Sequence, residues 1–134
     1  MRNYTLRLAD EYGISPNRMR ELRAFCLQYE EKKAKLSQLY TLSSAPPEVP
    51  VMGGTSGKPT ESKAILAVQL KSDIKLIDDC LAQAVGDDVG LLAPLKKNIT
   101  LGVGYDSLGY VPCGRNLFFQ YRRKFYFLLD KSKR

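Results

Sequence analysis

Histidine and tryptophan are absent from this 134-residue sequence, and the missing histidine narrows the possible chemistry most. Without it the chain lacks the usual general base near neutral pH and the commonest metal ligand. Cys26, Cys80 and Cys113 are far apart and follow no metal-ligand spacing, so reduced thiols are expected. The sequence also has no phosphate-binding Gly-Lys-Ser/Thr motif and no nucleophile elbow. We therefore expect no enzyme, no bound metal and no cofactor.

Long apolar runs are missing as well. No stretch of 18 apolar residues occurs, and the opening MRNYTLRLADEYG lacks the apolar core of a signal peptide. No segment alternates apolar and polar residues in the manner of a strand. We therefore expect a cytoplasmic, all-α protein that does not enter a membrane.

Acidic side chains are scarce at the C-terminal end. Residues 105–134 carry 7 basic and 2 acidic side chains, a net +5 of the +7 for the whole chain. Charge of one sign gathered in one terminal element favours a surface that faces a polyanion. Aromatic residues are interleaved with these basic ones from Phe118 to Phe127, and a purely solubilising tail has no need of them.

The same region has the periodicity of a helix, expected from Arg115 to Lys131. Its predicted buried face consists of Leu117 or Phe118, Tyr121, Phe125 and Leu128. Polar residues that fall off this face are Arg115, Asn116, Gln120 and Arg123. A short segment at 105–109 and a break at 110–114 precede the helix. This is the layout of a helix-turn-helix, whose second helix lies in the major groove of DNA.

We expect this helix to contact double-stranded DNA. Arg115, Asn116 and Gln120 are the candidates for reading base edges, because Arg prefers guanine while Asn and Gln prefer adenine. Phosphate contacts supply most of the affinity of such proteins. The expected phosphate contacts are Arg122, Arg123 and Lys124.

The run Pro-Cys-Gly-Arg-Asn-x-Phe-Phe-x-x-Arg-Arg-Lys-Phe, from Pro112 to Phe125, resembles the C-terminal end of phage transcriptional regulators of the RinA/ArpU type. That end is similar in turn to the helix-turn-helix of sigma-factor region 4. The resemblance covers nearly the whole chain in layout, but it is specific only over about the last 30 residues. It implies a phage- or prophage-type transcriptional regulator. The segment between Leu108 and Leu117 is shorter than the usual spacing, which predicts a shortened or rearranged turn.

Two long helices are predicted before this element, together with three or four shorter ones. Ser15 is expected to cap the first long helix, whose apolar series continues to about Tyr40. Thr60 is expected to cap the second. The two helices should pack antiparallel, and a continuous apolar stripe through Ile74 and Ile77 predicts a homo-oligomer.

The chain is expected to be one helical domain, residues 1–134. Residues 1–100 form its scaffold and oligomerisation part, which includes a mobile Pro/Gly-rich loop at 42–59. A shorter helix is predicted from Val89 to about Thr100. Residues 101–134 form the DNA-binding element.

Two alternatives stay open. The N-terminal opening holds a rival helix-turn-helix pattern, formed by Leu8, Ala9, Tyr12, Gly13, Ile14, Met19 and Leu22. With that motif as the DNA reader, the chain is a small-terminase-like DNA-packaging subunit. In the other alternative, the aromatic C-terminal helix docks on a protein such as RNA polymerase, and the chain is an adaptor.

Overall fold

The computed structural model describes residues 13–43 and 57–133, and these residues form helices with no strand among them. The helices are α2 (Pro16–Leu27), α3 (Tyr29–Ser43), α4 (Gly57–Val85), α5 (Leu92–Leu101) and α6 (Arg115–Lys133), with 3₁₀ turns η1 (Val89–Leu91) and η2 (Tyr105–Ser107). The predicted all-α class is therefore confirmed for the described residues. The start of the N-terminal motif and most of the predicted loop at 42–59 lie outside them.

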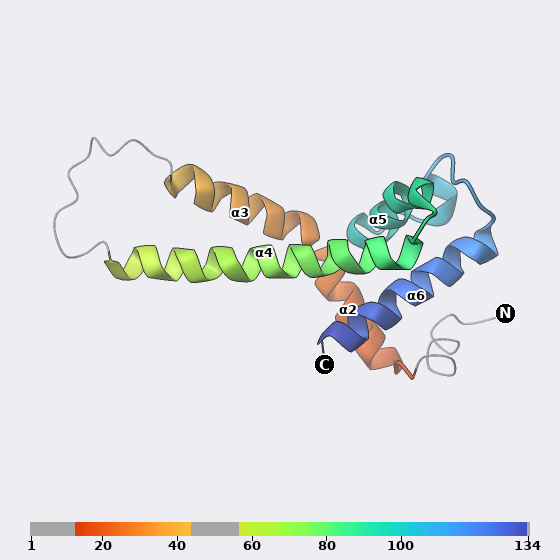
Figure 1. Cartoon of the computed structure of the whole chain (residues 1–134), viewed down its shortest axis with the longest axis horizontal. Helices are drawn as coiled ribbons and strands as arrows, with labels where there is room; N and C mark the ends of the chain where they lie inside the picture. Colours follow the sequence, from red (N-terminus) through yellow and green to blue (C-terminus); the bar gives the residue numbers. More distant parts are fainter. Residues whose placement is uncertain (1–12, 44–56, 134) are drawn as a thin grey trace.

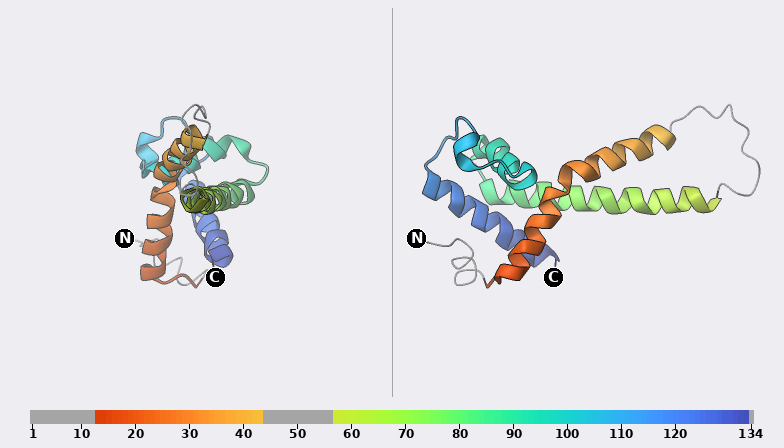
Figure 2. Two further views of the ribbon diagram at one scale, coloured as in Figure 1. Left: turned by 90° about the vertical axis from the view of Figure 1, so that its left-hand side faces the viewer. Right: turned by 180° about the vertical axis from the view of Figure 1, so that it is seen from behind.

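The first predicted long helix is broken at Gln28. Ser15 caps it as expected, its hydroxyl accepting from the Arg18 N–H at 3.1 Å. Gln28, however, has φ −88° and ψ 0°, and its N–H bonds only three residues back, to the Phe25 carbonyl. The chain changes direction there, so α2 crosses α6 while α3 runs along α4 (Figure 2). The expectation of one helix from residue 16 to residue 40 is wrong.

Helices α3 and α4 form a two-helix arm that projects from the rest of the molecule (Figure 1). Helix α3 leads away from the body, and α4 returns alongside it. An ion pair between Lys32 Nζ and Asp73 Oδ2, 3.0 Å apart, links the two helices. Helix α4 begins at Gly57, so Thr60 lies inside its first turns instead of capping it.

The body is built around the second half of α4. Helices α5 and α6 pack on it, α2 packs on α5 and α6, and together these helices enclose one apolar core. Ile77 of α4 is fully buried there, along with Leu81. The stripe through Ile74 and Ile77 is thus used for the chain's own core, and it is not the self-association surface that the sequence suggested.

The connection between α5 and α6 departs from the expected helix-turn-helix. Helix α5 ends at Leu101 and is capped by Gly102, whose φ of 72° lies in the left-handed region. Residues 105–109 form only one 3₁₀ turn where a short helix was expected. Tyr105 holds this turn in place, because its hydroxyl donates to the Cys113 carbonyl at 3.0 Å. The structure therefore has a rearranged connection instead of a tight turn between two α-helices.

Candidate nucleic-acid interface

Helix α6 begins at Arg115, as the sequence predicted, but its buried face is rotated from the expected one. The Phe118 N–H starts the helical series by donating to the Gly114 carbonyl at 3.0 Å. Phe118 and Phe125 are buried as expected. Leu117 is 44% exposed, and the other buried apolar residues of the helix are Tyr126 and Leu129. Helix α6 has apolar residues at several successive positions, so its sequence is compatible with either rotation about the helix axis. Packing against the body selects the observed rotation.

Aromatic residues hold this helix against the body. The ring of Tyr105, in η2, meets that of Phe118 edge to face with centroids 5.2 Å apart and lies 6.3 Å from that of Phe119. Within the helix, Phe118 meets Phe119 at 5.5 Å and Phe125 meets Tyr126 at 5.0 Å, and Phe118, Phe125 and Tyr126 belong to the buried core. Buried aromatic pairs of this geometry stabilise packing beyond the area they bury. Helix α6 is thus a firmly anchored element with one face left for solvent.

The burial of two predicted phosphate contacts is a correction to the sequence interpretation. Arg123 is only 4% exposed and lies inside the body, so it does not point toward solvent. Arg122 is half-buried; its Nε donates to Asn98 Oδ1 at 2.8 Å, and its guanidinium lies 5.0 Å from the Tyr126 ring centre. Burial lowers the pKa of Arg122 from its usual value. Both arginines thus hold α6 in place.

Three of the predicted residues do lie on the exposed side of α6. Asn116, Gln120 and Lys124 follow one another at four-residue steps, which places them along one side of the helix. We call these three residues the α6 stripe. Gln120 and Lys124 also line a shallow hollow of about 290 Å³ beside Leu117 and Tyr121.

Arg115 lies at the exposed start of the same helix. Its side chain is 54% exposed and donates to Asp106 Oδ1 at 2.9 Å. The guanidinium also lies 5.3 Å from the ring centre of Tyr105 and 5.7 Å from that of Phe119. An exposed ion pair of this kind contributes little to stability, so Arg115 can exchange Asp106 for another anion at small cost.

A second polar surface lies on α2. Asn17, Arg20 and Arg23 are exposed, and we call them the α2 outer face. Within it, Arg20 Nη1 donates to Asn17 Oδ1 at 2.9 Å. The adjoining Gly13 has φ 70° and Ile14 is fully buried, in agreement with the turn of the rival N-terminal motif. The earlier positions of that motif lie outside the described residues.

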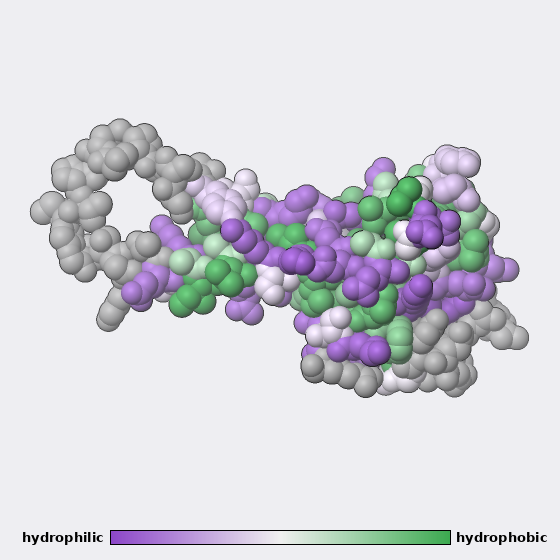
Figure 3. Space-filling view, in the orientation of Figure 1, coloured by the Kyte–Doolittle hydropathy of each residue, from purple (hydrophilic) through white to green (hydrophobic). Residues whose placement is uncertain are grey.

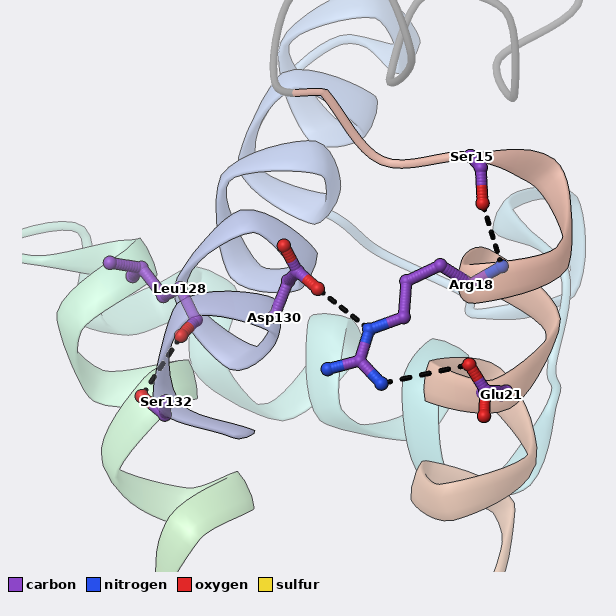
Figure 4. A network of polar contacts seen from close by, with 6 residues as sticks. All are labelled: Ser15, Arg18, Glu21, Leu128, Asp130 and Ser132. Carbon is purple, nitrogen blue, oxygen red and sulfur yellow. Dashed lines mark hydrogen bonds and ion pairs between the residues drawn. The ribbon is translucent and has the colours of Figure 1, made fainter. Parts of the chain in front are cut away.

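An ion pair that the sequence interpretation missed joins the two helices that carry these surfaces. Arg18 Nε of α2 donates to Asp130 Oδ1 of α6 at 2.7 Å, and Arg18 Nη1 lies 3.6 Å from Glu21 Oε1 (Figure 4). The Asp130 side chain is 3% exposed. The sequence did contain a signal for this ion pair, because Asp130 directly follows the apolar run Phe125–Leu129. A charged side chain beside such a run is usually buried only when it pairs with an opposite charge.

The described part of the chain has few other features of a catalytic or metal-binding site. Among the described residues, no three metal-ligating side chains gather at one place, and no helix is long and apolar enough to cross a membrane. The three cysteines are free thiols. Burial raises the pKa of Cys26 to about 12 and also raises the pKa values of Cys80 and Cys113. Low-pKa reactive thiols are therefore not expected at these positions.

Comparison with known proteins gave no match to a family model, a curated protein or a solved structure.

Proposed function

We propose that this chain is a cytoplasmic, phage- or prophage-type transcriptional regulator that binds duplex DNA through the exposed side of α6. The observation that carries the proposal is the α6 stripe, a run of amide and basic side chains on a helix whose other side is anchored by buried aromatics. A recognition helix needs this combination, because base contacts require side chains held in register by a rigid support.

The residues of the α6 stripe and Arg115 would make different contacts with DNA. Asn116 and Gln120 are suited to adenine, whose N6 and N7 atoms match an amide, and Arg115 is suited to guanine. Lys124 supplies a phosphate contact. With Arg122 and Arg123 engaged in the body, further cations must come from elsewhere. The C-terminal end of α6 offers the exposed Lys131; Lys133 is exposed too, but its Nζ lies 3.9 Å from the ring centre of Phe25 in α2.

A second candidate function is a protein adaptor, for example one that contacts RNA polymerase. It is favoured by a hollow of about 320 Å³ lined by Asp87, Asp88, Val89, Gly90, Leu91, Pro112, Cys113 and Leu117. Val89 and Leu117 are exposed beside the two carboxylates, and the Tyr121 hydroxyl donates to Asp88. Such a surface suits a protein partner with apolar and basic side chains better than it suits a nucleic acid.

Fluorescence anisotropy against duplex fragments from the chain's own genomic neighbourhood tests the proposal. The proposal expects one fragment to bind more tightly than a scrambled duplex of the same length, with affinity falling as salt rises. Asn116→Ala or Gln120→Ala should cost about 1–3 kcal/mol on that fragment. Gln38→Ala, an exposed amide on α3, is the matched control. The titrations are run at two salt concentrations. If the wild type binds all duplexes with equal affinity at both, sequence-specific regulation is contradicted.

A further inference from the structure

The Arg115 side chain is held by the η2 turn, which precedes α6. Its Nη1 donates to Asp106 Oδ1 at 2.9 Å. Its guanidinium lies 5.3 Å from the ring centre of Tyr105 and 5.7 Å from that of Phe119. Tyr105 and Asp106 are consecutive residues of η2. The position of the guanidinium is therefore determined largely by a segment outside the helix that carries it.

The η2 turn is itself fixed to the body. The Tyr105 hydroxyl donates to the Cys113 carbonyl at 3.0 Å, and the Tyr105 ring meets that of the fully buried Phe118 edge to face at 5.2 Å. Within the turn, the Ser107 N–H donates to the Gly104 carbonyl at 2.9 Å. Because the turn is anchored in these ways, it can hold the guanidinium in place before a ligand arrives.

This arrangement lies on the side of the body away from the arm, where α6 begins with Arg115 (Figure 1). Figure 3 shows hydrophilic and apolar surface side by side at that end, on the right of the view. The side chains of Arg115 and Asp106 are 54% and 82% exposed. A duplex that contacts Arg115 therefore also meets the Asp106 carboxylate.

We infer that Asp106 is a positioning residue that directs Arg115 toward a guanine edge and away from DNA phosphates, an inference that rests on the proposed function. A phosphate at Arg115 either replaces Asp106, which exchanges one ion pair for another, or lies beside its carboxylate and is repelled. Guanine O6 and N7 are uncharged acceptors. They can accept from Nε and Nη2 of the guanidinium while Asp106 keeps Nη1.

Asp106 acts on the ratio of two affinities, that for the preferred duplex and that for a scrambled duplex, which we call the specificity ratio. A free arginine loses rotamer freedom when it binds, and this loss weakens binding. Arg115 is already held by Asp106 and two aromatic rings, so less freedom remains to be lost at the guanine. The general repulsion between a carboxylate and DNA is the same for every sequence, so it changes both affinities and leaves their ratio unaltered.

Anisotropy titration of Asp106→Asn, which removes the charge but keeps the shape, tests the inference. Affinity for the scrambled duplex should rise about two- to fivefold, because Arg115 becomes available to phosphates. Affinity for the preferred duplex should stay the same or fall, so the specificity ratio should fall about three- to tenfold. Asp79→Asn is the matched control, since Asp79 forms an exposed ion pair with Lys75 at 2.7 Å on α4, and its specificity ratio should equal that of the wild type.

A double-mutant cycle with Arg115→Ala separates positioning from a general effect of charge. If Asp106 acts through Arg115, Asp106→Asn lowers the specificity ratio of the wild type but leaves that of Arg115→Ala unchanged. An equal fall in both backgrounds, or no fall in the wild type, overturns the inference while the proposed function stands. A wild type that binds both duplexes equally overturns the proposed function, and the inference with it.

Discussion

Three consecutive basic residues of α6 should respond to truncation in three different ways. Arg122→Ala removes the 2.8 Å hydrogen bond to Asn98 and the contact with the Tyr126 ring. A hydrogen bond from a charged donor contributes about 1.5–3 kcal/mol, and a cation–π contact about 0.5–2 kcal/mol. Because Arg122 is only half-buried, we expect a loss of about 2–3 kcal/mol in the free energy of unfolding.

Arg123→Ala removes a side chain that is 4% exposed, so the packing of its stem inside the body is lost. We expect a loss of about 2–4 kcal/mol. Lys124 is exposed, and Lys124→Ala should change the free energy of unfolding by less than about 0.5 kcal/mol. Urea denaturation followed by circular dichroism gives all three values. If Lys124→Ala destabilises as much as Arg123→Ala, or if both arginine variants are as stable as the wild type, the orientation of α6 is wrong.

Three further predictions concern the fold. Phe125→Ala should destabilise the protein by about 3–5 kcal/mol in urea denaturation, because Phe125 is fully buried; a loss below about 1 kcal/mol would contradict that burial. Gly102→Ala should cost about 1 kcal/mol because φ there is 72°, whereas Gly104→Ala, at φ −67° with open space around it, should be neutral or slightly stabilising; equal effects would contradict the left-handed cap. Burial raises the pKa of the Cys26 thiol from 9.0 to about 12, so the unfolded chain loses this proton at a lower pH than the folded protein does. The free energy of unfolding should therefore fall as pH rises from 9.0 toward 12. In denaturation measured against pH, Cys26→Ala should reduce that fall, and an unchanged slope would contradict the shift.

The helical class and most helix positions could be predicted from the sequence because the apolar spacing is regular. Helix α6 starts at the predicted residue, and α5 ends at Leu101, one residue after the predicted end, although it begins at Leu92 and not at Val89. The break at Gln28 could not be predicted, since the apolar series runs through it without a proline or glycine. It depends on tertiary packing, which draws Tyr29 into the core and lets its hydroxyl donate to Asp78 at 2.8 Å.

The candidate site was only partly predictable for a related reason. Helix α6 has apolar or aromatic residues at so many positions that the periodicity leaves its rotation undetermined by about one residue. That small rotation decides whether Arg123 faces solvent or the core. In the structure, the packing of α6 on the body places Arg123 inside. Asn116, Gln120 and Lys124 lie farther from the boundary, so they are exposed in either setting.

The central claim is that the α6 stripe, and not the α2 outer face, binds DNA. The most direct measurement compares two triple-alanine variants, one of each surface, by anisotropy titration of the preferred duplex at two salt concentrations. The account predicts that the α6 variant loses sequence preference and that its salt dependence falls by about one ion, while the α2 variant binds almost as the wild type does. Unchanged binding by the α6 variant with lost binding by the α2 variant would contradict the account and make the N-terminal motif the reader.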